Sequence, residues 1–96
     1  METRGYSVQP FHSGNSLRVA VLRALSDAPD GLSIREILAL PALTLLVKVY
    51  GNQAIRQTVY SLNAAGLTFI TPGTITARHF ITALGRQVLP LYQAEL

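Results

Sequence analysis

The spacing of apolar residues between positions 52 and 65 predicts an amphipathic helix. Ile55, Val59 and Leu62 recur at i, i+4 and i+7, which places their side chains on one stripe of a helix. Gly66 follows as the left-handed residue that commonly closes a helix. The opposite stripe contains no carboxylate and carries two amides, a guanidinium and a phenol, on Gln53, Arg56, Gln57 and Tyr60. The pattern therefore indicates a helix whose outward face is suited to hydrogen bonding.

An earlier apolar run predicts a first helix that begins near residue 15. Residues 1–14 show no clear period and contain glycine and proline, so we expect an N-terminal arm there. Asn15 or Ser16 can cap the helix that follows. Val19 and Leu22 fall outside its core stripe, which indicates a second buried face against the arm or against another copy of the chain. The core stripe itself comprises Leu17, Val21, Ala24 and Leu25.

A turn and a short helix are expected next. Residues 27–31 combine aspartate, proline and glycine, which stop helices. Ser33 and Glu36 match a capping box, the pairing of serine and glutamate that begins a helix. Pro41 limits this helix because the residue before a proline is displaced from helical geometry. The side chains expected to face inward are those of Ile34, Ile37 and Leu38.

The strongly apolar segment 42–50 allows two interpretations. It can form a short strand at Leu45–Val49 or an additional helical turn. Periodicity does not separate these alternatives, because a short apolar run fits both.

The segment after Gly66 predicts a β-hairpin and a final helix. Residues 67–71 and 74–81 are rich in β-branched and aromatic side chains, with Pro72-Gly73 between them as the turn. The threonine at position 82 can cap a last helix over 82–89. Pro90 is expected to end or kink that helix.

Composition indicates one small folded domain. The 96 residues are 49% hydrophobic and 14% charged, unlike a disordered segment, and suffice for a single modest core. We therefore assign residues 15–96 to one domain after the arm. The absence of cysteine excludes disulfides and thiolate metal sites. With no long apolar run and no apolar core in the N-terminal segment, we expect a cytoplasmic protein that does not span a membrane.

The distribution of charge favours a polyanionic partner. The net charge is only +3, but no acidic residue occurs between Glu36 and Glu95. A surface without acids presents a positive potential even when its cations are few. The cations in this span are Lys48, Arg56, Arg78 and Arg86. Among polyanions, nucleic acid is the expected partner.

Two stretches carry a resemblance to a known family. Ser61–Leu67, reading SLNAAGL, is similar to the segment where winged helix-turn-helix domains leave the recognition helix for the wing. Phe80–Leu89, reading FITALGRQVL, is similar to the strand-to-helix junction of MarR-like and PadR-like regulators. The resemblance covers roughly residues 16–89 and implies a mostly helical α+β fold, in which a three-helix core is followed by a two-stranded wing and a C-terminal helix. It also implies sequence-specific binding to double-stranded DNA, most simply as a repressor.

The resemblance assigns roles to individual residues. The helix 52–65 would lie in the major groove, capped by Asn52. Tyr60 would contact phosphate or sugar, unless it belongs to the edge of the core. Residues that could read base edges are Gln53, Arg56 and Gln57. Phosphate contacts are expected from the second helix through Ser33 and Arg35, and from the hairpin through Thr71, Thr74, Thr76 and Arg78.

The remaining patterns argue against catalysis and for association. No pair of carboxylates lies close in sequence within the folded half, and no phosphate-binding glycine loop or nucleophile motif occurs, so we expect no enzyme, no catalytic residue and no cofactor. His79 is expected to be half-buried and hydrogen-bonded, and no metal site or small-molecule ligand is predicted. A homodimer would double the contacts of one small module. The alternative function is a winged helix that binds protein and not DNA, which the low cation count and the apolar segment 40–50 favour.

Overall fold

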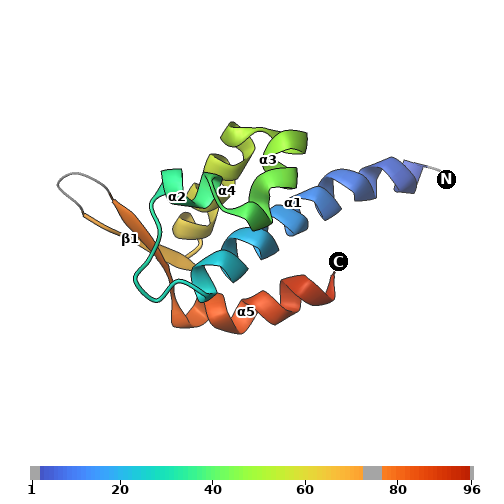
Figure 1. Ribbon diagram of the computed structural model, residues 1–96. Helices are drawn as coiled ribbons and strands as arrows, with labels where there is room; N and C mark the ends of the chain where they lie inside the picture. Colours follow the sequence, from blue (N-terminus) through green and yellow to red (C-terminus); the bar gives the residue numbers. More distant parts are fainter. Residues whose placement is uncertain (1–2, 73–76, 96) are drawn as a thin grey trace.

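The computed structural model describes residues 3–72 and 77–95, with side chains described from Asn15 onward. The chain forms a mostly helical α+β fold in which a two-stranded antiparallel sheet extends from one end of a group of helices (Figure 1). The elements in chain order are α1 (Thr3–Ser26), α2 (Ile34–Leu38), the 3₁₀ helix η1 (Pro41–Leu43), α3 (Thr44–Tyr50), α4 (Asn52–Ala64), β1 (Thr68–Thr71), β2 (Arg78–Ile81) and α5 (Ala83–Ala94).

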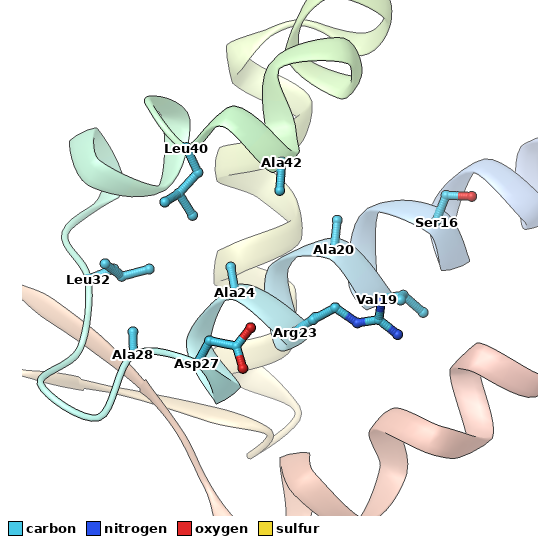
Figure 2. Close-up of a pocket in the computed structure, with 10 residues that line it drawn as sticks. All are labelled: Ser16, Val19, Ala20, Arg23, Ala24, Asp27, Ala28, Leu32, Leu40 and Ala42. Carbon is cyan, nitrogen blue, oxygen red and sulfur yellow. The ribbon is translucent and has the colours of Figure 1, made fainter.

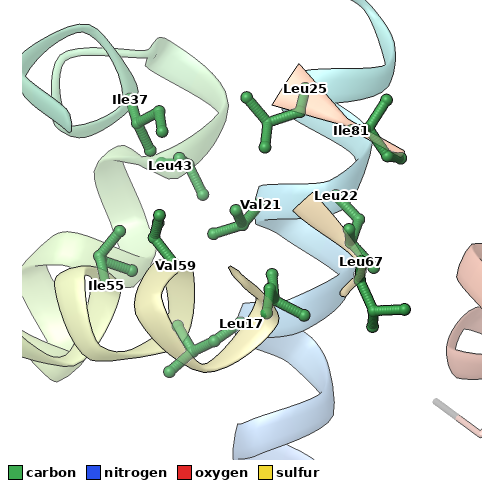
Figure 3. Packing of buried hydrophobic residues seen from close by; sticks show 11 residues of the cluster. Leu17, Val21, Leu22, Leu25, Ile37, Leu43, Ile55, Val59, Leu67 and Ile81 are labelled. Atoms are coloured by element: carbon green, nitrogen blue, oxygen red, sulfur yellow. The ribbon is translucent and has the colours of Figure 1, made fainter. Parts of the chain in front are cut away.

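The core lies between α1, α4 and the root of the hairpin. The apolar stripe predicted for α4 is confirmed, since Ile55, Val59 and Leu62 are buried. These side chains face those of α1 and η1 (Figure 3). The other buried members of the cluster are Leu17, Val21, Leu22, Leu25, Ile37, Leu43, Leu67 and Ile81.

The first helix begins earlier than the sequence predicts. Helical backbone starts at Thr3, and the expected caps Asn15 and Ser16 lie inside α1. Asn15 is buried, its amide donates to the Glu95 carboxylate at 2.7 Å, and its carbonyl oxygen accepts from Arg18 at 2.9 Å. The carbonyl oxygen that would act as a cap thus bonds Arg18 of the same helix, and the amide bonds Glu95, so the prediction of a helix start at this position was wrong.

The second buried face of α1 is covered from within the chain. Leu22 belongs to the same cluster as Leu67 and Ile81, at the root of the hairpin. The helix α5 packs along α1, and the Arg18 guanidinium lies 5.7 Å from the centre of the Tyr92 ring. Leu22 is therefore core and is not available as a contact with another copy.

The capping box and the helical interpretation of the apolar segment are both confirmed. The Ser33 hydroxyl accepts from the Glu36 amide at 3.1 Å, and the Glu36 carboxylate accepts from the Ser33 amide at 2.9 Å. After α2, η1 begins at Pro41 and leads directly into α3. Leu43, Leu46 and Val47 pack toward the core at i, i+3 and i+4, a helical spacing that a strand would not satisfy.

Gly51 separates α3 from α4 and replaces the expected asparagine cap. Its φ of 90° and ψ of 160° allow the chain to change direction in a single residue, in a region that L side chains rarely adopt. Asn52 is already the first residue of α4, so its assignment as a cap was wrong.

The hairpin is tied to the turn that follows α1. The strands β1 and β2 pair antiparallel with Thr68 opposite Ile81, and Gly66 has the expected positive φ of 80°. Beyond the sheet, Leu32 and His79 form an isolated antiparallel bridge with backbone bonds of 2.7 and 3.0 Å. The predicted residues Thr74 and Thr76 lie outside the described residues.

The last helix is capped as expected but continues through its proline. The Thr82 hydroxyl accepts from the Gly85 amide at 3.0 Å. Pro90 lies within α5, so of the two effects expected of it, the ending of the helix does not occur. Both Pro90 and Arg86 are exposed, so water can bond the carbonyl of residue 86 that the missing N–H leaves free. The packing of Tyr92 against α1 favours continuation of the helix.

Candidate nucleic-acid interface

The outward face of α4 carries the polar side chains that the sequence predicts for it. Gln53, Arg56, Gln57 and Tyr60 are all exposed, and Tyr60 retains 51% of its surface. They project outward because Ile55, Val59 and Leu62 fix the inward stripe. The face contains no acidic side chain, and it therefore combines hydrogen-bonding capacity with a positive charge from Arg56.

A groove of about 570 Å³ joins this helix to α2 and the hairpin. Four of the predicted site residues, one or more from each of these elements, line it together: Ser33, Arg35, Tyr60 and Arg78. Its wall also includes His79 and Ile70 of the hairpin. The fold thus brings α2, α4 and β2 to one polar surface, as the sequence-based assignment requires.

Arg78 is held by acceptors of its own chain. Its Nε donates to the Asp30 carbonyl at 3.0 Å, and a terminal nitrogen donates to the Gly31 carbonyl at 2.8 Å. The same nitrogen lies 3.1 Å from the Glu36 carboxylate. The side chain of Arg78 therefore folds back onto the turn 27–31 and α2, and the acceptors that it meets there belong to its own chain and not to a phosphate.

Glu36 is a residue of the groove that sequence reasoning used only as a cap. The hydrogen bond from the Ser33 backbone, followed by the charge of Arg78, holds the pKa of the Glu36 carboxyl below its usual range. The side chain is 47% exposed. The sequence did contain a signal for it, since Glu36 is the last acid before a long span without any.

His79 is more deeply buried than the sequence predicts. It is 2% exposed, and burial lowers its pKa from the ordinary value of 6.5, so its neutral form is favoured. Its backbone pairs with Leu32, but within the described part of the chain its Nδ1 has no hydrogen-bond partner, contrary to expectation. The Tyr60 ring lies 6.4 Å away, which places the imidazole under the edge of the α4 face.

Gln57 lies toward the opposite edge of the α4 face. It lines a smaller hollow of about 240 Å³ between α1 and α4, together with Arg18 and Ser61. Tyr60 and Gln57 therefore border different grooves, one on each side of the helix.

A third hollow lies on the other side of α1. It measures about 530 Å³ and is lined on one side by α1, including Val19, Ala20 and Ala24, with Leu32, Leu40 and Ala42 opposite them (Figure 2). Arg23 and Asp27 stand at its border.

The described residues do not suggest a metal centre or a membrane segment. Residues 3–72 and 77–95 contain no group of three or more potential ligands placed to hold a metal ion. Among the helices described, none has the length and apolar character needed to cross a bilayer. Comparison with known proteins found no matching family model, no similar curated protein and no similar solved structure.

Proposed function

We propose that the protein is a sequence-specific double-stranded DNA-binding regulator of the winged helix-turn-helix type, acting as a repressor. The observation that carries this proposal is the outward face of α4, which is amide-rich, cationic and free of acid. It adjoins a polar groove shared with α2 and the hairpin. The element order, with helices before a hairpin and a helix after it, is the one expected of such a domain.

In this proposal α4 enters the major groove. Arg56 has the guanidinium that pairs with a guanine edge, and Gln53 and Gln57 have the amides that pair with adenine. Ser33, Arg35 and Tyr60 border the groove beside α4, where they would meet the phosphate backbone and fix the register of the helix. Repression would follow from occlusion of a promoter.

A homodimer on a two-fold operator is part of the proposal. One small module makes few contacts, and a second copy would double them. The two apolar side chains first considered for contact with another copy, Val19 and Leu22, are both buried. The exposed candidates are Leu45 and Val49 on α3 and Leu91 on α5.

The test is a binding titration against duplex DNA from the upstream region of the gene that encodes the protein. Random-sequence duplex serves as competitor, at two salt concentrations. We expect binding that weakens steeply with salt, because phosphate contacts release counterions, and that survives the competitor. Absence of binding at low salt contradicts the proposal.

A second candidate function, binding to another protein, is favoured by one observation. Leu45 and Val49 of α3 are 68% and 62% exposed, next to each other on one side of a short helix. Exposed apolar side chains in a cluster commonly mark an interface. Salt separates the two candidates, since an apolar interface responds little to ionic strength.

A further inference from the structure

One carboxylate stands within the surface proposed for DNA. Glu36 lines the groove with Arg35, Tyr60 and Arg78. The next acid in the chain, Glu95, lies elsewhere and contacts Asn15 where α5 meets α1. A negative charge on a surface that meets a polyanion opposes association, so the place of Glu36 calls for an explanation.

The contacts of this carboxylate orient it toward Arg78. The Ser33 amide donates to one carboxylate oxygen at 2.9 Å, and a terminal nitrogen of Arg78 lies 3.1 Å from the same oxygen. The carbonyls of Asp30 and Gly31 accept from the same guanidinium on its other side. The arginine, whose side chain is 38% exposed, is therefore held against the turn 27–31 and α2, and Glu36 offsets its charge.

The fold alone does not require a carboxylate at position 36. A capping box is satisfied equally by glutamate and glutamine, because each offers an oxygen to the serine amide. An exposed ion pair also contributes little to stability. The contact that uses the charge of Glu36 is its ion pair with Arg78, and that contact adds little to stability.

We propose that Glu36 is a negative determinant of non-specific DNA binding, because it withholds Arg78 from the phosphate backbone. Stable binding then depends on the base contacts of α4, and random duplex is bound weakly. This inference rests on the proposed function, and it explains how the proposed DNA-binding site would limit its own affinity for random duplex.

The test compares Glu36→Gln with Asp27→Asn. Both changes remove one negative charge, but Asp27 lies at the end of α1, outside the groove. Affinity for labelled random-sequence duplex is measured by fluorescence anisotropy over a series of salt concentrations. For Glu36→Gln we expect affinity on the order of tenfold higher near 0.1 M salt and a salt slope steeper by about one, the effect of one added phosphate contact. For Asp27→Asn we expect a change of at most about twofold, because salt screens a charge outside the contact.

Two further variants identify Arg78 as the group released. The double variant Glu36→Gln/Arg78→Gln should lose the gain, and Arg78→Gln alone should leave the salt slope of the wild-type protein unchanged. Circular dichroism melting confirms that each variant is folded. The Arg78→Gln measurement can overturn the inference even if Glu36→Gln fails to fold, since a slope reduced by one shows that Arg78 already contacts phosphate.

The outcomes separate this inference from the function on which it rests. A gain that Asp27→Asn reproduces, or that persists without Arg78, overturns the inference and leaves the DNA-binding function standing. A wild-type protein that binds neither duplex at low salt contradicts the function itself.

Discussion

Polar side chains on the outward face of α4 are exposed to solvent, whereas comparable side chains on the hairpin side of the groove bond or pack within the protein. On α4, Arg56 and its neighbouring amides are directed to solvent, while the residues beneath them supply the core contacts. On the hairpin, Arg78 bonds the turn after α1, and His79 is buried beside it. A polar side chain at the candidate site can therefore serve either a partner or the fold. Substitutions on the two sides should separate binding from stability.

The largest expected effect is on stability, from Gly85→Ala at the root of the hairpin. Gly85 is buried, and a Cβ there would overlap the Leu67 carbonyl oxygen and lie 2.7 Å from the Ile81 side chain. The backbone of Leu67 cannot move without shifting β1, so we expect a loss of roughly 1–3 kcal/mol in the free energy of unfolding. Urea denaturation measures it.

The matched control for this variant is Leu84→Ala on the exposed side of the same helix. It should change the free energy of unfolding by less than about 0.5 kcal/mol. Equal losses from the two substitutions would show that the close approach at Gly85 is not what limits the packing of α5.

The next largest expected effect is a weakening of DNA binding by Arg56→Ala. The side chain is exposed, so stability should change by less than about 0.5 kcal/mol. Specific DNA binding should weaken by about 1–3 kcal/mol, with the preference lost at one base pair. Binding titrations on a set of single-base operator variants check it. If affinity falls equally for all sequences, Arg56 contacts phosphate and does not read a base.

A smaller effect on stability is expected from Arg78→Gln. The change removes the donors to the Asp30 and Gly31 carbonyls and the partner of Glu36, and we expect a loss of about 1 kcal/mol in the free energy of unfolding. Arg35→Gln is the control, since that exposed arginine borders the same groove from α2. If the two variants are equally stable, the bonds of Arg78 do not anchor the hairpin. Arg78 would then serve the fold no more than the exposed side chains of α4 do.

Periodicity predicted the local elements well because their determinants are local. The stripe of Ile55, Val59 and Leu62, the capping box at Ser33 and the glycine after α4 each depend on neighbouring residues and were confirmed. The helix start expected at Asn15 and the helix end considered at Pro90 are both absent, and at both positions the structure shows contacts distant in sequence. Asn15 bonds a residue 80 positions away, and Pro90 lies in a helix held against α1.

The part of the candidate site on α4 could be predicted from the sequence because its determinants are local. The part on the hairpin was less predictable because contacts distant in sequence determine it. The exposure of Gln53 and Arg56 follows from the helical period alone. The contacts of Arg78 with Asp30 and Gly31 cross 47 to 48 positions of the sequence, and no spacing rule indicates them. Alternation in a strand predicts the face that a side chain occupies but not the partner that it finds there.

The smallest expected effect is a pH dependence that originates at His79. Burial lowers the pKa of this imidazole below 6.5 in the folded chain, so the unfolded chain binds the proton more readily. Stability should therefore be fully present above about pH 6.5 and decline as the pH falls below it, with a slope of at most about 1.4 kcal/mol per pH unit. Glu36, whose pKa lies below its ordinary 4.5, contributes in the same direction only at lower pH.

Urea denaturation between pH 5 and pH 7.5 measures this slope, and His79→Phe is the variant that isolates it. Phenylalanine keeps an aromatic ring in the buried position and does not titrate, and no hydrogen bond to Nδ1 within the described residues is lost. The variant should be at least as stable as the wild type at pH 5. Its free energy of unfolding should change little with pH above pH 5. A slope that survives the substitution would assign the pH dependence to other groups. The burial of His79 would then carry no measurable cost in proton binding, and the contrast between the hairpin and the open face of α4 would not extend to pH dependence.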